Sequence, residues 1–192
     1  ITYLNKNQKL LIRYKKKGVM IMKKSISLLT ILSLLISLII PVNASASGYT
    51  QWKQYGESWS AKGMGSNNAS VQLYGCTSVA LSMAAVRLGC ENESSFNPGV
   101  FVDRMNNKGG YDSYGNIYWD NVRKAVPNMS MVGKQIKFGD QDNSRKINTI
   151  ASYLNSGYAV IVTILRKTTS KGNNWHYVLA DYVSGNNLYI LD

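Results

Sequence analysis

The stretch that decides the fold is Gly75–Leu88, which reads GCTSVALSMAAVRL. It is made of small and apolar residues at a helical spacing, which predicts a helix that begins at Cys76. The residues expected on its buried face are Ala80, Met83, Ala84 and Leu88. Unpaired N–H groups and the helix dipole are expected to favour the Cys76 thiolate and to lower its pKa. We therefore expect Cys76 to be a reactive thiol, with a thiol packed in the core as the alternative.

Helical patterns dominate the chain before Pro127, and strand patterns dominate after it. A helix capped by Asn97 is expected from Pro98 to about Asn106, and another over 117–126. The second half holds a weak strand at 131–138, an amphipathic helix at 145–156 that Gly157 ends, and strands at 158–165, 175–183 and 188–191. A helical N-terminal half followed by an antiparallel sheet in the C-terminal half predicts an α+β fold.

The first 46 residues are expected to be absent from the mature protein. Residues 1–21 are interpreted as an untranslated upstream region, because a purine-rich ribosome-binding site can be encoded at their end. Residues 22–46 have the form of a secretory signal peptide, with a 15-residue apolar run at 26–40 and a small-residue cleavage site at 44–46. The mature domain is then 47–192, a bacterial protein that is secreted, in the medium or associated with the cell wall, with no lipid anchor.

The formal net charge of +12 is concentrated in the segments expected to be removed. Residues 1–46 hold eight of the 22 basic residues and no acidic one, so the mature chain has a net charge of +4. This charge is too small and too scattered to predict nucleic-acid binding. One histidine and two distant cysteines cannot form a usual zinc site, so no metal and no cofactor are expected.

The two cysteines are not expected to form a disulfide. If 76–89 is one helix, Cys76 and Cys90 lie about 20 Å apart along its axis. A disulfide needs Cα atoms within roughly 7 Å of each other. Cys76 is then a free thiol in an exported protein, and Cys90 is expected to be a small buried apolar residue.

A base and a carboxylate for Cys76 can be found near the end of the chain. His176 is the only histidine, and it lies on a strand of alternating residues where its ring can face a cleft. Asp192 follows the next strand and is the natural residue to orient the ring by accepting a hydrogen bond from one of its nitrogens. Asp181 is a less suitable carboxylate, because it belongs to the opposite face of the His176 strand. A structural histidine and a turn aspartate are the plain alternatives.

Four blocks of the sequence together resemble one enzyme family. They are QYGESW at 54–59, GCTSVALSM at 75–83, WHYVL at 175–179 and YILD at 189–192. This pattern is similar to the bacteriocin-processing (double-glycine) peptidase-like family of papain-like cysteine peptidases, and it covers nearly the whole mature chain. The resemblance implies a papain-like two-lobe fold in which a nucleophile from the helical half faces a base from the sheet half.

The resemblance also implies a role for each site residue. Cys76 would be the nucleophile, His176 the general base, Asp192 the orienting residue and Gln54 the oxyanion-hole donor. The Gln54 amide and the Cys76 backbone N–H would supply two donors to a tetrahedral intermediate. Gln51 and Gln72 are competitors for the oxyanion-hole role. The family pattern usually continues with a proline where this chain stops at Asp192, which leaves open a C-terminal truncation.

Three functions are compatible with these residues. The first is a thiol hydrolase that cleaves a peptide or amide bond in a peptide, a protein or a cell-wall peptide through a Cys76 thioester. The second is an acyl or peptidyl transferase that uses the same triad. The third is a non-catalytic cell-wall or protein-binding domain, whose mark would be an exposed strip of aromatic residues. The candidates for that strip are Trp52, Tyr55, Trp59, Tyr111, Tyr114 and Trp119. A monomer is expected in each case.

Overall fold

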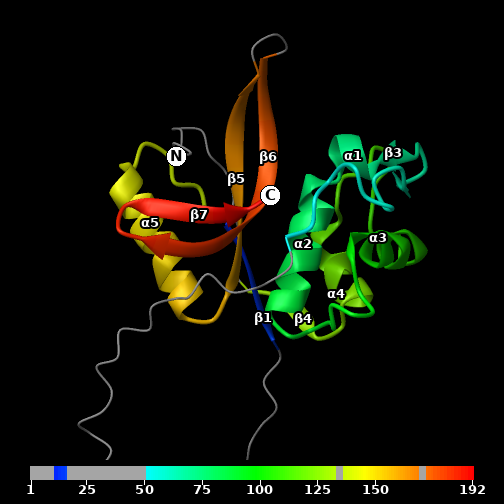
Figure 1. Cartoon of the computed structure of the whole chain (residues 1–192), viewed down its shortest axis with the longest axis horizontal. Helices are drawn as coiled ribbons and strands as arrows, with labels where there is room; N and C mark the ends of the chain where they lie inside the picture. The colour runs from blue at the N-terminus through cyan, green and yellow to red at the C-terminus, as the bar shows by residue number, and fades with distance from the viewer. Residues whose placement is uncertain (1–10, 17–50, 133–135, 169–171) are drawn as a thin grey trace, which may run out of the picture.

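The computed structural model describes residues 11–16, 51–132, 136–168 and 172–192 (Figure 1). The protein mixes helices and an antiparallel sheet, in agreement with the α+β expectation. The helices α1 to α4 gather on one side of the long strands β5 and β6, and α5 lies on the other side with β7 crossing over it (Figure 1). The expected signal peptide at 22–46 lies outside the described residues.

The main sheet has five strands in the order β4-β1-β5-β6-β7, and every pairing is antiparallel. Its longest strands are β5 (Ala159–Thr168) and β6 (Gly172–Ser184). Strand β5 begins one residue after the start of the predicted strand at 158–165, and β6 contains the predicted strand at 175–183. The remaining strands are β1 (Leu11–Lys16), β4 (Met129–Met131) and β7 (Asn187–Leu191). The register of β6 with β5 places His176 opposite Ile164, well along the strand from its turn into β7.

Strand β1 lies between β4 and β5 and belongs to the segment 1–21 that the sequence predicts to be untranslated. Tyr14 is the register partner of both Met131 on β4 and Ala159 on β5. The interpretation of 1–21 as an upstream region stays a prediction, because strand pairing does not report on where translation starts. The site described below is built from residues after 50.

Helix α2 (Cys76–Arg87) is the centre of the helical half and confirms the predicted helix. The sequence predicts one buried face, but all eight residues from Ser78 to Ala85 are buried. The reason is that α2 packs against α3 (Pro98–Asn107) on one side and against β6 and β5 on the other. Small Ala and Ser side chains let neighbours approach from both sides. The helix therefore holds Cys76 at a fixed place beside the sheet.

The alternation that the sequence predicts for β6 separates two cores in the structure. Leu179 and Ile161 face α2, whereas Val178, Val160 and Val162 lie in a second cluster. That second cluster is covered by α5 (Asn143–Asn155), which begins at the N-cap Asp142. The predicted helix at 145–156 is thereby confirmed, and a positive φ at Gly157 allows the chain to turn back into β5.

The segments between α2 and α5 are more irregular than the sequence predicts. Helix α3 is capped by the Asn97 side chain as expected. The helix expected at 117–126 is only a 3₁₀ turn, η2 (Trp119–Asn121), followed by α4 (Val122–Ala125). The strand expected at 131–138 is wrong in the part that is described: β4 ends at Met131, and 133–135 lie outside the described residues. The other short elements are α1 (Val71–Tyr74), β2 (Gly63–Met64) and β3 (Ala69–Ser70).

The end of α2 is fastened to the sheet through Arg87. Its guanidinium donates to the backbone carbonyl of Ala180 at 2.8 Å and to that of Asp181. It also pairs with the Asp181 carboxylate at 3.2 Å, and both side chains are largely buried. This contact joins the helical half to β6 at the opposite end of α2 from Cys76.

Among the helices in the described ranges, none is long and apolar enough to cross a membrane.

Candidate active site

The position of Cys76 is fixed by the turn that precedes it. Gly75 separates α1 from α2, and its N–H donates to the Val71 carbonyl at 2.7 Å. A Cβ at residue 75 would lie 2.6 Å from that same oxygen, so only glycine fits without a shift. The backbone and side chain of Val71 therefore pack directly against this glycine. Cys76 is half-buried at the first turn of α2.

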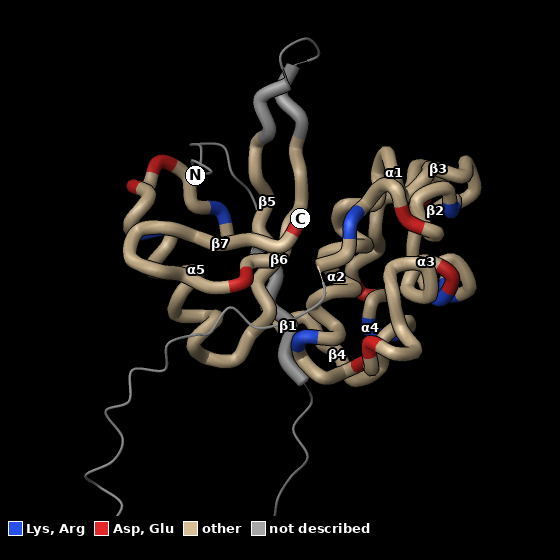
Figure 2. Tube along the Cα trace, viewed as in Figure 1, with Lys and Arg blue, Asp and Glu red and all other residues tan. Residues whose placement is uncertain are grey.

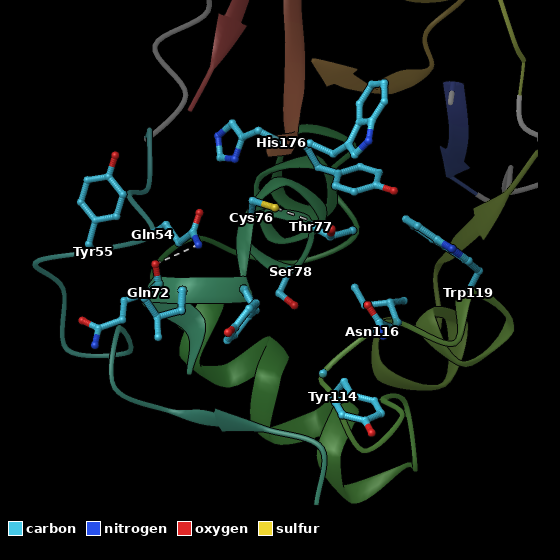
Figure 3. A pocket seen from close by; sticks show the side chains of 16 residues that line it. Gln54, Tyr55, Gln72, Cys76, Thr77, Ser78, Tyr114, Asn116, Trp119 and His176 are labelled. Carbon is cyan, nitrogen blue, oxygen red and sulfur yellow. Dashed lines mark hydrogen bonds between the residues drawn. The ribbon is translucent and has the colours of Figure 1, made fainter. Parts of the chain in front are cut away.

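His176 reaches Cys76 from β6. His176 is 7% exposed as a residue, and it lines the same cavity as Cys76 (Figure 3). A hydrogen bond between the two side chains is one cause of the pKa shifts of both groups. The nucleophile and base predicted from the sequence, one hundred residues apart in the chain, therefore meet at one site.

Asp192 holds the other side of the imidazole ring. The His176 Nε2 donates to Asp192 Oδ1, so the Nδ1 nitrogen is the one left for the sulfur. Gln51, a competitor for the oxyanion-hole role, donates its side-chain amide to the Asp192 backbone carbonyl at 2.7 Å. Asp181, the competing carboxylate, pairs instead with Arg87. The structure thus places Cys76, His176 and Asp192 in a row, in the order that a triad requires.

The electrostatics of the pair favour its charged form. Burial raises the pKa of the Cys76 thiol, but hydrogen bonds from the His176 ring and the Tyr177 backbone N–H outweigh burial and hold it below the ordinary value. Burial lowers the pKa of His176, but its hydrogen bonds with Asp192 and Cys76 raise it to about 9. A lowered thiol pKa and a raised imidazole pKa both shift the pair toward a thiolate beside an imidazolium.

Gln54 and Gln72 both lie at the cavity with Cys76 (Figure 3). The Gln54 side-chain Nε2 donates to the Gln72 backbone carbonyl at 3.1 Å, which fixes the direction of the amide. An amide nitrogen has two hydrogens, so the second can serve a substrate oxygen. Of the three glutamines considered, Gln54 is the one whose side-chain amide is held at the cavity by a hydrogen bond.

The cavity in front of Cys76 has a volume of about 380 Å³ and is open to solvent. Gln54 and Tyr55 lie to one side of Cys76 in Figure 3, and Asn116 and Trp119 lie to the other. Tyr177, the neighbour of His176, packs beside Trp119 with ring centroids 6.5 Å apart. The sequence did not assign Trp175, Tyr177 or Asn116 to the site. Their position directly before and after His176 in the chain could have suggested the first two, whereas nothing in the sequence indicates Asn116.

The aromatic strip expected of a binding domain divides into two groups. Trp52, Trp59 and Tyr111 are buried in the core, where the two tryptophan rings meet edge to face at 6.3 Å. The other three line the cavity with Cys76, and they are Tyr55, Tyr114 and Trp119. Of these three, Tyr55 and Tyr114 are exposed, as expected of the strip.

Both cysteines are thiols, as the sequence predicts. Cys90 is buried, and its Sγ donates to the Asn128 carbonyl at 3.4 Å. Within the described ranges, no group of three or more His, Cys, Asp or Glu side chains could hold a metal ion. The basic and acidic positions of the described trace are interspersed (Figure 2).

No family model, no curated protein and no solved structure matches this chain.

Proposed function

We propose that this protein is a secreted papain-like cysteine peptidase that hydrolyses a peptide or amide bond through a Cys76 thioester. The observation that carries the proposal is the row formed by Cys76, His176 and Asp192 at an open cavity. A thiolate at a helix N-terminus, beside a ring oriented by a carboxylate, is an activated nucleophile with its base. The resemblance of the four sequence blocks to the double-glycine peptidase-like family supports the same assignment.

In the acylation step, the Cys76 thiolate attacks the scissile carbonyl carbon and a C–S bond forms. The carbonyl electron pair moves to oxygen, where the Gln54 amide and the Cys76 backbone N–H can donate hydrogen bonds. The tetrahedral intermediate collapses, the C–N bond breaks, and the His176 imidazolium gives its proton to the leaving amine. Asp192 keeps the ring in place while its charge changes.

In the deacylation step, the now neutral His176 ring takes a proton from water as the water oxygen attacks the thioester carbon. The C–S bond then breaks, the carboxylic acid product leaves, and Cys76 returns as a thiolate beside imidazolium. A transferase would use an amine in place of water at this step. Product analysis with added amines separates the two: hydrolysis gives the free acid, and transfer gives a new amide.

The test is turnover of a peptide library by the wild-type protein and by Cys76→Ala and Cys90→Ala. Cys90 is the matched control, because it is the other thiol of the chain and lies buried away from the cavity. We expect Cys76→Ala to abolish turnover and Cys90→Ala to retain it. Retention of turnover by Cys76→Ala would refute the proposal. Binding of peptides without turnover by the wild-type protein would favour the non-catalytic alternative.

A further inference from the structure

The described lining of the cavity in front of Cys76 is mainly polar and uncharged. Apart from the Cys76–His176 pair, none of these described residues carries a charge. An uncharged donor or acceptor that enters the cavity can exchange its bound water for a side-chain partner. The groups of this kind that every peptide carries are the N–H and C=O of its main chain. Amide and hydroxyl groups on the lining include those of Gln54, Gln72, Thr77, Ser78 and Asn116.

The Asn116 side chain lies on the other side of Cys76 from Gln54 (Figure 3). Its Nδ2 donates a hydrogen bond to Asp112 Oδ2 at 2.7 Å. A carboxylate can only accept hydrogen bonds, so the amide nitrogen is the atom that faces Asp112. Within the described ranges no hydrogen bond engages the amide oxygen, and Asn116 is exposed. Asn116 Oδ1 is therefore an acceptor that a ligand in the cavity can use.

Asp112 holds the Asn116 amide in this orientation. Its carboxylate also accepts from the backbone N–H groups of Tyr114 at 2.8 Å and Asn116 at 2.9 Å. The hydrogen bond from the Asn116 side chain is the main cause that holds the pKa of Asp112 below its ordinary value, so the carboxylate stays an acceptor at neutral pH. Gly65 packs under this loop, where a Cβ would lie 1.9 Å from the Asp112 carbonyl. The amide is thus oriented before a ligand arrives.

The two sides of the cavity offer opposite hydrogen-bonding groups. Gln54 Nε2 uses one hydrogen on the Gln72 carbonyl and has a second to donate, whereas Asn116 Oδ1 can only accept. A peptide main chain carries both a C=O acceptor and an N–H donor in each residue other than proline. The cavity volume of about 380 Å³ lies in the range of small-ligand sites, so one bound segment can contact both sides.

We propose that Asn116 is a substrate-binding residue, whose Oδ1 accepts a hydrogen bond from a main-chain N–H of the peptide near the scissile bond. Asp112 is the positioning residue that orients it. This inference deepens the function proposed above and rests on it for the class of ligand. The contact is with the main chain, so it fixes the direction of the peptide without a requirement for a particular side chain. Asn116 takes no part in the bond changes.

The experiment compares a peptide with its main-chain ester analogues. The probe is the library peptide that binds the Cys76→Ala protein most tightly, and each analogue has oxygen in place of one main-chain N–H. Calorimetry gives the Kd for the Cys76→Ala protein and for the same protein with Asn116→Ala or Asn121→Ala added. Asn121 is the matched control, because its side chain donates to the Gly109 carbonyl at 2.8 Å and it is not among the cavity-lining residues.

We expect one ester analogue to bind the Cys76→Ala protein about 3- to 10-fold more weakly than the probe, the usual effect of one lost hydrogen bond. This loss should disappear when Asn116→Ala is added and persist when Asn121→Ala is added. Each loss is a ratio within one protein, so a general change in affinity cancels. The exposed Asn116 keeps its backbone bond to Asp112 in the variant, so the loop is expected to keep its fold.

Losses that are equal in all three proteins at every position would overturn the inference, and so would a library in which no peptide binds. Cleavage of the probe by the wild-type protein separates this inference from the proposed function. Cleavage without any position that depends on Asn116 would overturn the contact and leave the peptidase intact. A position that depends on Asn116, in a probe that the wild-type protein never cleaves, would overturn the proposed function and leave the contact.

Discussion

At the scale of single residues, the His176 ring serves two partners at once. Its Nε2 contacts the Asp192 carboxylate, and its interaction with Cys76 is a second cause of its raised pKa. Each contact stabilises the protonated ring, and the protonated ring in turn stabilises the thiolate. The reactivity of the Cys76 sulfur therefore depends on the Asp192 carboxylate, which acts on the sulfur through the His176 ring.

The pH dependence of activity follows from these two pKa shifts. The Cys76 pKa lies below its ordinary value, and the His176 pKa is raised from 6.5 to about 9. The ion pair is present between these two values, so kcat/KM should fall as pH rises through about 9 and imidazolium is lost. Asp192→Asn removes a hydrogen bond that raises the His176 pKa, so the alkaline limb should move to lower pH. An unchanged alkaline limb in the variant would contradict the role of Asp192.

Gln54 is expected to act in the transition state more than in substrate binding. Removing one oxyanion-hole donor typically lowers kcat by about 10²–10³-fold. We expect Gln54→Ala to show a loss of this order with little change in KM, measured by steady-state kinetics on a cleaved peptide. Gln51→Ala is the matched glutamine control, because Gln51 contacts the Asp192 carbonyl and lies outside the main cavity lining. An equal loss in kcat for both variants would argue against a specific role for Gln54.

At the scale of elements, the junction between α1 and α2 determines where the nucleophile lies. The chain closes a short helix, turns at Gly75 and starts α2 at once, with no room for a Cβ beside Val71. The sequence showed the start of this helix because small and apolar residues follow Cys76 without a break. It did not show that α2 is buried on more than one face, because this depends on α3 and the sheet approaching from both sides.

Gly75→Ala tests this junction. The added methyl would meet the Val71 carbonyl and side chain, each at 2.6 Å, and the backbone would have to shift. Overpacking of this kind typically costs about 1–3 kcal/mol of unfolding free energy. We expect that loss in urea denaturation, together with lower kcat because Cys76 moves with the turn. Gly109→Ala, at an open position after α3, is the control for a glycine change without a clash: its positive φ of 60° makes some loss of unfolding free energy expected there too, but kcat should stay unchanged.

Elements that depend on a strong local pattern could be predicted, and those that depend on tertiary contacts could not. Strands β5 and β6 and helix α5 follow from β-branched runs and an amphipathic repeat. The region 117–138 lacks such a pattern, and its short helices and strand form where neighbouring elements leave space. His176 could be singled out because it is the only histidine of the chain, and Cys76 because a helical pattern starts at it. The Asp112 loop and Asn116 were not, because their place at the cavity arises from packing against Gly65.

At the scale of the whole molecule, the proposed catalysis would require the helical half and the sheet to keep a fixed position relative to each other. Cys76 comes from α2 and His176 from β6, and the two elements are joined at the far end of α2 by Arg87. Small movements of reacting groups out of alignment can cost a large part of the rate. Arg87 is thus expected to matter for activity although it lies at the other end of the helix from the sulfur.

Arg87→Met removes the guanidinium and leaves the Asp181 carboxylate without its partner on α2. Breaking a largely buried pair in this way typically costs about 3–5 kcal/mol. We expect a loss of this order in chemical denaturation and a lower kcat under folded conditions. Lys62→Met is the control, because its pair with Asp103 is exposed and such pairs contribute at most about 1 kcal/mol. Equal losses of unfolding free energy in Arg87→Met and Lys62→Met would contradict the larger contribution expected of the buried Arg87–Asp181 pair.

The most direct measurement of the central claim is the rate of Cys76 alkylation by iodoacetamide as a function of pH, in wild-type protein and in His176→Ala. The account predicts fast alkylation of the wild type at mildly acidic pH, with a thiolate midpoint below the ordinary value of 9.0, and a midpoint in His176→Ala that moves back upward. A wild-type profile like that of free cysteine, unchanged by His176→Ala, would contradict it.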